Sequence, residues 1–282
     1  MADPRVLEPA AGTVAGPTVA GAYGALVRSR IAAQASYRSS FALDIAAQVL
    51  IGLVEFAEVY VVFSQVEKLG GFSFAEVTLI FGLATAGFGL ADLVVGHVDR
   101  LPYYVRTGQL DAFLLRPLSA LGQLVTSDFS LRRLGRVVVS LVLLAVALTA
   151  VDIEWTPARV VLLLVTPLIG AVIFGAVFVA TSAVGFWLVE GTEFTNAFTY
   201  GGNYLSSFPF TVFGSVVRRT FTFVIPIAFV AYLPALALLG REDPLGLPGW
   251  LSWSAGPVAL LSCCAAGLVW RVGLRHYTGA GS

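Results

Sequence analysis

Long apolar blocks alternate with short polar stretches along this chain, which is the pattern of membrane-spanning helices. A spanning helix needs about 20 mostly apolar residues, because the hydrocarbon core is about 30 Å thick and each helical residue rises about 1.5 Å. The sequence therefore predicts an all-α integral membrane protein with six transmembrane helices. They lie at residues 41–63, 77–97, 134–151, 159–189, a broken tract 194–239, and 254–272.

The residues ahead of the first tract differ in character. Residues 1–20 are rich in Pro, Gly and Ala and lack a continuous apolar core, so we expect a disordered tail. In residues 21–40, Arg28, Arg30 and Arg38 alternate with aromatic and aliphatic residues, which predicts a helix lying in the membrane interface. We treat residues 21–282 as a single transmembrane domain.

Composition agrees with a membrane protein. Of the 282 residues, 57% are hydrophobic and 12% are charged, about half the charge of a typical soluble domain, so one soluble core would not hide the apolar surface. The formal net charge is zero, which gives no basic footprint for nucleic acid. Cys263 and Cys264 are adjacent in an apolar run, which suits neither a disulfide framework nor a metal site.

Basic residues give the orientation, because arginine-rich loops tend to stay cytoplasmic. Six crossings with cytoplasmic N- and C-termini leave five basic residues outside: Lys68, Arg159, Arg218, Arg219 and Arg241. The other twelve lie inside: Arg5, Arg28, Arg30, Arg38, Arg100, Arg106, Arg116, Arg132, Arg133, Arg136, Arg271 and Arg275. Arg218 and Arg219 fit this rule poorly. They would lie inside if 194–215 stayed on the inner surface and 220–239 made the crossing, whereas Pro226 and Pro234 favour a kinked or re-entrant hairpin.

Polar residues gather on one face of the first predicted helix, at Asp44, Gln48, Gly52, Glu55 and Glu58. Acidic groups are costly in hydrocarbon, so this face should meet another helix, a cavity or a partner subunit. One interpretation is a substrate path. The other is hydrogen bonding between helices, with the end residues at headgroup level.

Small and polar residues also share one face of the second predicted helix, at Gly82, Thr85, Gly89, Asp92 and Gly96. Such a face allows close helix packing, and Asp92 is its exception. The basic cluster Arg132, Arg133 and Arg136 begins the third helix, where we expect it to hold the helix end at the anionic inner leaflet.

The sequence lacks the motifs of several classes of enzyme. The sole lysine, Lys68, has no phosphate-binding GxxxxGK loop around it, and neither HExxH nor GxSxG occurs. We therefore expect no catalytic site, no metal site and no bound cofactor in this chain.

Four segments are similar to one known family. The sequence GQLDAFLLRPLSALGQ, residues 108–123, resembles the G-x-L-D-x-x-L-L-R-P-L element of bacterial ABC transporter permeases of the drug-exporter type, the subgroup of multidrug, daunorubicin and viologen exporters. The same family is resembled by YRSSF at 37–41, GFW at 185–187, and PIAFVAYLPALALLGREDPLG at 226–246. Together these segments span nearly the whole chain in the right order.

The resemblance implies a permease subunit of the bacterial cell (inner) membrane. A short cytoplasmic coupling helix at 105–117 would dock on a separate ATP-binding subunit, which would bind ATP and magnesium. Its contact residues would be Arg106, Asp111 and Arg116, and Leu110, Phe113 and Leu114 would anchor it to the bundle. Gly108 also belongs to this coupling segment, and the helix would end before Pro117. The resemblance also implies a re-entrant extracellular hairpin around Pro226 and Pro234, and a second permease subunit, identical or a sister, that completes the path.

Other interpretations stay open on the residues alone. The segment 105–117 also suits an ordinary interfacial loop with no partner. A secondary carrier or a membrane scaffold would need no ATPase, although no repeat relates residues 41–151 to 159–272. The many aromatic and apolar residues of the chain would suit a lipophilic drug, a lipid or a peptide as substrate.

Overall fold

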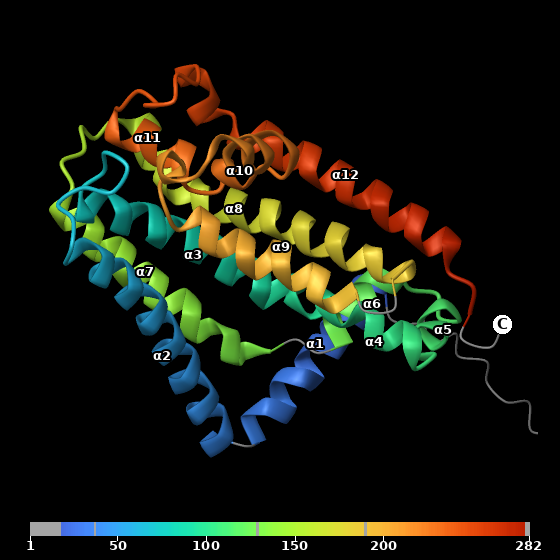
Figure 1. The fold of residues 1–282 in the computed structure, drawn as a ribbon. Helices are drawn as coiled ribbons and strands as arrows, with labels where there is room; N and C mark the ends of the chain where they lie inside the picture. Colours follow the sequence, from blue (N-terminus) through green and yellow to red (C-terminus); the bar gives the residue numbers. More distant parts are fainter. Residues whose placement is uncertain (1–17, 37, 128–129, 189–190, 280–282) are drawn as a thin grey trace, which may run out of the picture.

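The all-α prediction is confirmed for the part of the chain that the structure describes. A computed structural model describes residues 18–36, 38–127, 130–188 and 191–279, and these ranges contain helices and loops but no β-strand (Figure 1). Of the expected disordered tail at 1–20, residues 1–17 lie outside the described ranges. A helix, α1, already begins at Val19.

Helices of six residues or more form most of the fold. They are α1 (Val19–Ser36), α2 (Arg38–Phe63), α3 (Phe74–Val95), α4 (Leu101–Arg106), α5 (Gln109–Leu114), α6 (Ala120–Ser127), α7 (Leu134–Ala150), α8 (Pro157–Ala183), α9 (Gly191–Ser206), α11 (Tyr232–Leu239) and α12 (Ala255–His276). Shorter turns connect them: η1 (Gly96–Arg100), η2 (Leu131–Arg133), η3 (Val184–Phe186), η4 (Phe210–Val212), α10 (Ser215–Arg219), the π-helical η5 (Thr220–Val224), η6 (Ile227–Phe229) and η7 (Gly249–Trp253).

Among the described residues, four helical stretches are long and apolar enough to cross a membrane: Phe41–Phe63, Phe74–Arg106, Pro157–Phe186 and Ala255–His276. A fifth is added if Ser215–Val224 and Ile227–Leu239, which meet at a bend of 73°, count as one broken span. α7 is apolar but has only 17 residues, and α9 has 16. The count of six spans therefore stays a prediction.

α3 is the central helix of the bundle. It packs between α7 and α8, while α2 covers the far side of α7 and α12 the far side of α8 (Figure 1). Burial follows this order, since 78% of the apolar window of α3 is buried inside the chain against 11% for α2. Much of the apolar surface of α2 thus has no cover within this chain and suits contact with lipid or with another subunit.

The small-residue face of α3 packs as the sequence predicted. A Cβ on Gly82 would lie 3.0 Å from the Cα of Leu144 in α7, and a Cβ on Gly89 would lie 3.1 Å from Val137. Gly87 meets α8 instead, where a Cβ would be 3.1 Å from the Cα of Gly170. These contacts bring the three helix backbones close together, which is how membrane helices associate when no hydrophobic gain is available.

Polar contacts join α3 to α11 at one end of the bundle, which we call the α11 end; the opposite end, which carries α4 to α6, is the α5 end. Ser73 caps α3 through a reciprocal pair of hydrogen bonds with Glu76. Arg241, just after α11, forms an ion pair with Glu76 at 2.7 Å and lies over the ring of Phe72 at 4.5 Å. The loop after α11 is therefore attached to the start of the central helix.

Replacing Gly87 with leucine should destabilise the bundle, because the side chain would push α3 away from Gly170. Overpacking of this kind costs about 1–3 kcal/mol. The matched control is Gly267→Leu in α12, where a Cβ meets nothing within 4 Å. The temperature at which the detergent-solubilised protein loses its monodisperse peak should fall for Gly87→Leu only. Equal temperatures for the two variants would contradict the close contact.

Candidate functional site

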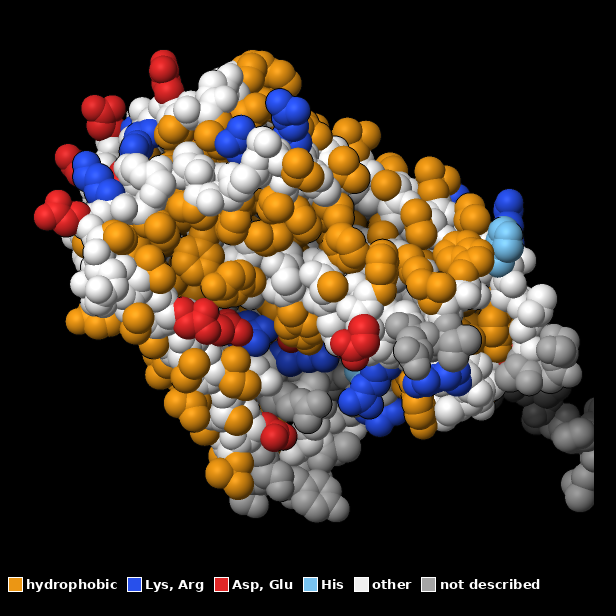
Figure 2. All heavy atoms as spheres, in the orientation of Figure 1, with side chains coloured by type: hydrophobic (Ala, Val, Ile, Leu, Met, Phe, Trp, Pro, Cys, Tyr) orange, Lys and Arg blue, Asp and Glu red, His pale blue; other side chains and the backbone are white. Residues whose placement is uncertain are grey.

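A polar cavity of about 250 Å³ opens between α2, α3, the start of α7 and α9. Figure 2 shows the hollow, where acidic and basic side chains meet between α2 and the rest of the molecule. Its lining comes from Asp44, Ala47, Gln48, Ile51, Asp92, Arg133, Arg136 and Tyr200. Five of these side chains are ionisable, in a region that the hydropathy pattern assigns to the membrane, so their pairing decides whether the site is stable.

Arg133 and Asp92 form the first charge pair of this cavity. Nη1 of Arg133 lies 3.2 Å from Oδ1 of Asp92 and also donates a hydrogen bond to the Asp92 backbone carbonyl. Both side chains are largely buried, at 15% and 9% exposed. Gly96, one turn after Asp92, provides the room that this pair needs, because a Cβ at this position would overlap the Asp92 carboxylate and the Arg133 guanidinium. The pair joins the start of α7 to the central helix.

Arg136 and Glu55 form the second pair, one turn further along α7. Nη2 of Arg136 donates to Oε1 of Glu55 at 3.2 Å, and the guanidinium lies 5.2 Å from the ring centroid of Phe88 in α3. The Arg136 side chain is 9% exposed and that of Glu55 is 32% exposed. One arginine therefore contacts α2 through charge and α3 through a cation–π interaction.

The structure brings together the acidic and polar residues that the sequence proposed for a path or for packing. Asp44, Gln48 and Asp92 line the polar cavity, and Glu55 lies beside it through its pair with Arg136. Asp44 is exposed, whereas Asp92 is buried between helices. These residues therefore serve both helix packing and cavity lining, because the two ion pairs join the helices that enclose the cavity.

The expected role of the basic cluster is wrong for Arg133 and Arg136. Both were expected to hold the end of α7 at the inner leaflet, but they point into the bundle and pair with acids on α2 and α3. A signal for this was present in the sequence. Arginines three residues apart lie on one helix face, and buried acids on two other apolar helices require basic partners. The side chain of Arg132 lies outside the described part of the structure.

The α4–α6 segment, residues 101–127, forms a compact group of short helices at the α5 end. Leu110 is fully buried in an apolar cluster that also contains Leu101 and Leu124 of this segment, Ala183 of α8 and Trp270 of α12. Phe113 packs on the edge of the same cluster, with its ring 5.4 Å from that of Tyr104. The buried side of α5 is therefore packed against α8 and α12.

Hydrogen bonds and backbone geometry fix the shape of this segment. The carboxamide of Gln123 is buried and donates to the carbonyls of Phe113 and Leu118 at 2.8 and 3.1 Å, which closes the chain around Pro117. Gly108 begins α5 with φ of +69°, a conformation that favours glycine. The single helix expected over 105–117 is therefore interrupted: α4 ends at Arg106, the chain turns at Gly108, and α5 covers only Gln109–Leu114 before Pro117.

The apex of the segment is exposed and mixes charge with apolar surface. Arg106 and Arg116 are exposed, and between them Leu115 is 88% exposed. Leu114 was expected to anchor the helix, but it is 45% exposed and lies on the open side instead. The reason is the pitch of α5: Leu110 and Phe113 share the buried face, and the next residue turns away from it.

Asp111 lies against the C-terminal segment of the same chain. A Cβ on Gly279 would be 3.4 Å from Oδ1 of Asp111, and Tyr277 packs at the edge of the cluster that holds Leu110. The carboxylate was proposed to contact a partner subunit. In the structure it also braces α5 against the residues that follow α12.

The two prolines of the predicted hairpin have different environments. Pro226 stands at the 73° bend between Ser215–Val224 and Ile227–Leu239, where its ring cannot continue the preceding helical turn. Pro234 is buried near the start of α11, a position at which its missing N–H removes no helical hydrogen bond. The sharp bend at Pro226 agrees with both a kinked and a re-entrant segment.

Comparison with known proteins gives one match. A family model described as "ABC-2 family transporter protein" matches residues 49–281, which includes the polar cavity except Asp44, Ala47 and Gln48, and the whole α4–α6 segment. No curated protein and no solved structure matches the chain.

The pair between Arg136 and Glu55 should show strong energetic coupling. Arg136→Met and Glu55→Gln should each destabilise the fold by about 2–4 kcal/mol, because each leaves the remaining partner charged, partly buried and without an opposite charge beside it. The double variant should cost less than the sum by about 1 kcal/mol or more. A mixed-micelle denaturant titration measures the free energies of unfolding.

The Arg159–Glu154 pair provides the control for this cycle. Its atoms are 3.7 Å apart and the Glu154 side chain is 93% exposed, so its coupling should stay below about 0.5 kcal/mol. Additive effects at Arg136 and Glu55 would contradict a structural ion pair.

Proposed function

Because the chain belongs to the ABC-2 family of transporter proteins, we propose that it is the permease subunit of an ATP-driven exporter. A membrane domain of this family is a permease and not itself the ATPase, which agrees with the absence of a phosphate-binding loop from the sequence. ATP and magnesium bind to a separate ATP-binding subunit, and this chain supplies the route through the membrane.

One observation carries the proposal: the α4–α6 segment has an exposed, charged apex and a buried base. Arg106, Leu115 and Arg116 form the apex, and the buried side chain of Leu110 packs the segment against the bundle. Arginine is among the residues enriched in binding hot spots. The apex docks on the ATP-binding subunit, and the base transmits its movement to α8 and α12.

The proposed topology has six crossings, made by α2, α3, α7, α8, α9 and α12. The segment 215–239 then enters from the extracellular side, bends at Pro226 and returns as α11. The 73° bend and the shortness of α11 support this, as does the twelve-to-five distribution of basic residues. The α5 end is then cytoplasmic, together with both termini, and the α11 end is extracellular.

The transport path runs between this chain and a second permease subunit, identical or a sister. The polar cavity supports this proposal, because one chain encloses it incompletely. α2 is mostly uncovered, and Tyr200 of α9, which lines the cavity, is 39% exposed. A second subunit facing α2 and α9 closes the path, with Asp44 and Gln48 at its wall.

Transport work comes from nucleotide binding and not from chemistry in this chain. ATP binding draws the two ATP-binding subunits together and shifts the docked apexes. The apolar cluster around Leu110 then moves the cytoplasmic ends of α8 and α12, while α3 stays in the tightly packed centre. A ligand shifts such an equilibrium only through its different affinities for the two states, so ATP must bind the closed arrangement better.

The finer assignment is a permease of the drug-exporter type in the bacterial inner membrane. Support comes from the segments at 108–123 and 226–246, with residues 21–282 acting as one permease domain. The rival is a secondary carrier or a membrane scaffold. The ion pairs in the bundle, Asp92–Arg133 and Glu55–Arg136, are a feature that secondary carriers share. An ATPase with Walker motifs encoded next to this gene favours the exporter.

Substituting Arg106 and Arg116 with alanine should uncouple the transporter. We expect the double variant to insert and fold normally, because both side chains are exposed, and to lose about thirtyfold in affinity for the ATP-binding subunit if each arginine contributes about 1 kcal/mol. Pull-down with the ATPase encoded by the neighbouring gene, and ATP-dependent drug efflux from proteoliposomes, measure the two effects.

Arg275→Ala is the matched control, since this exposed arginine lies at the same end of the bundle but on α12. It should bind the ATPase and transport like the unmodified protein. Unchanged binding and efflux in the Arg106/Arg116 variant would discard the docking proposal, and efflux without any ATPase would favour a secondary carrier.

A further inference from the structure

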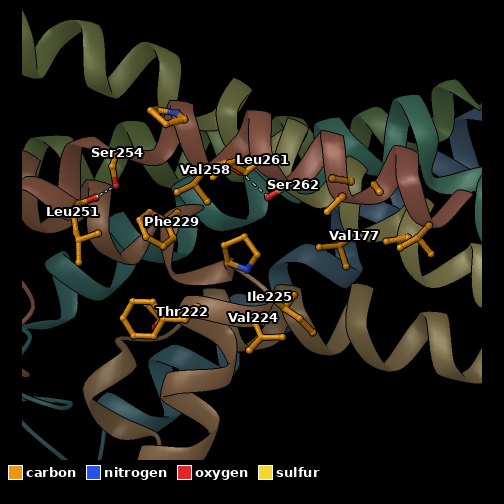
Figure 3. A pocket seen from close by; sticks show the side chains of 18 of the residues that line it. Val177, Thr222, Val224, Ile225, Phe229, Leu251, Ser254, Val258, Leu261 and Ser262 are labelled. Atoms are coloured by element: carbon orange, nitrogen blue, oxygen red, sulfur yellow. Dashed lines mark hydrogen bonds between the residues drawn. The ribbon is translucent and has the colours of Figure 1, made fainter.

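An apolar groove of about 590 Å³ runs between α8, α12 and the turn at residues 222–226, away from the polar cavity. Figure 3 shows Val177 of α8, Val258 and Leu261 of α12, and Val224 and Ile225 of the turn around the same space. The proposed transport path makes no use of this groove. Its chemistry therefore points to a separate ligand.

The walls that α8 and α12 form are mostly apolar, and their hydroxyls are already hydrogen-bonded within the chain. Ser262 and Thr181 point hydroxyls toward the groove region, but each donates to a carbonyl of its own helix, at 2.8 and 2.7 Å. Ser254 likewise donates to the carbonyl of Leu251 at 2.8 Å. Hydroxyls satisfied in this way do not select a polar ligand, so this part of the groove suits a hydrocarbon chain.

The groove has the length and direction of a lipid chain. It follows α12 from Ser254 to Val269, a rise of about 22 Å at 1.5 Å per residue, which is most of the hydrocarbon thickness. Trp250, 67% exposed, stands where the groove begins. Tryptophan is enriched at membrane interfaces, and this one lies at the α11 end, the extracellular end in the proposed topology.

Two arginines precede the groove-lining turn in the sequence. Arg218 and Arg219 end α10, and Thr222 to Pro226 form the lining a few residues later. Among the described residues, neither side chain has a hydrogen bond or an ion pair. The pair also departs from the general placement of basic residues in the sequence. An anionic group from outside the protein explains both facts.

We propose that the groove binds one acyl chain of an outer-leaflet phospholipid, whose phosphate is held by Arg218 and Arg219. Guanidinium groups suit this role because their N–H donors match the geometry of phosphate oxygens. The bound lipid fills the space between α12 and the turn at Pro226, and so joins the two elements on this side of the bundle.

Native mass spectrometry of the delipidated full-length protein, titrated with phosphatidylglycerol, tests the proposal. Arg218→Gln combined with Arg219→Gln should weaken binding of this lipid about thirtyfold, from about 1 kcal/mol for each basic residue near the membrane surface. The control, Arg271→Gln with Arg275→Gln, removes two charges from the other end of α12 and should leave the affinity unchanged. Equal affinities for the two double variants overturn the site.

Filling the groove tests the acyl chain separately. Ala265 is exposed and lines the groove, so Ala265→Trp should fold and should lose the lipid. Leu260→Trp is the control, because Leu260 is 67% exposed on α12 outside the lining. Retention of the lipid in Ala265→Trp overturns the proposal. So does loss of self-association with lipid binding intact, which would assign the groove to a second copy of the chain.

Two truncated ligands separate the two parts of the site. Dioleoylglycerol has the chains without phosphate, and glycerol 3-phosphate has the phosphate without chains. Both should bind at least tenfold more weakly than phosphatidylglycerol. Equal binding of dioleoylglycerol removes the arginines from the site, and equal binding of glycerol 3-phosphate removes the groove; either result contradicts the proposal.

Discussion

A charged side chain is costly in hydrocarbon unless an opposite charge lies beside it, and this constraint organises one half of the bundle. Arg133 and Arg136 are one turn apart at the start of α7, and they pair with Asp92 of α3 and Glu55 of α2. Neither acid can leave its arginine without exposing a charge to lipid or to a buried site. α7 therefore holds α2 beside the central helix, with the polar cavity between them.

The packing distinguishes a tightly packed centre from an exposed apex. Glycine contacts lock α3 against α7 and α8, and Arg241 attaches the loop after α11 to the start of α3. At the opposite end, the α4–α6 segment is rooted in the bundle by Leu110 and has an exposed apex. Through Leu110 the apex is connected to Ala183 of α8 and Trp270 of α12, and the proposed coupling uses this contact.

The sequence was most informative where one helix face carried one kind of residue. Long apolar tracts predicted helices that the structure contains, and the glycine spacing on residues 82–96 predicted the face that α3 turns to α7. Hydropathy was less informative for α9 and residues 215–239, because Gly201, Gly202 and Pro226 break the periodicity. Leu114 was misplaced since a six-residue helix has too few turns to define its buried side. Arg133 and Arg136 were misplaced because basic residues were counted only by their position in the loops. Their shared helix face and the buried acids on two other helices indicated that partners were needed, but the sequence did not show which acid pairs with which arginine.

The proposed transport path requires that the polar cavity between the paired charges is filled with water within the membrane. Ala46 and Ala47 test it directly, because both are exposed on α2 at the same depth, but Ala47 lines the cavity and Ala46 does not. Each is replaced with cysteine after Cys263 and Cys264, the two free thiols, are changed to alanine. A charged thiol reagent applied to inside-out vesicles should label Ala47→Cys at least roughly tenfold faster than Ala46→Cys, since the reactive thiolate forms only in water. Equal labelling rates at the two positions would contradict the account.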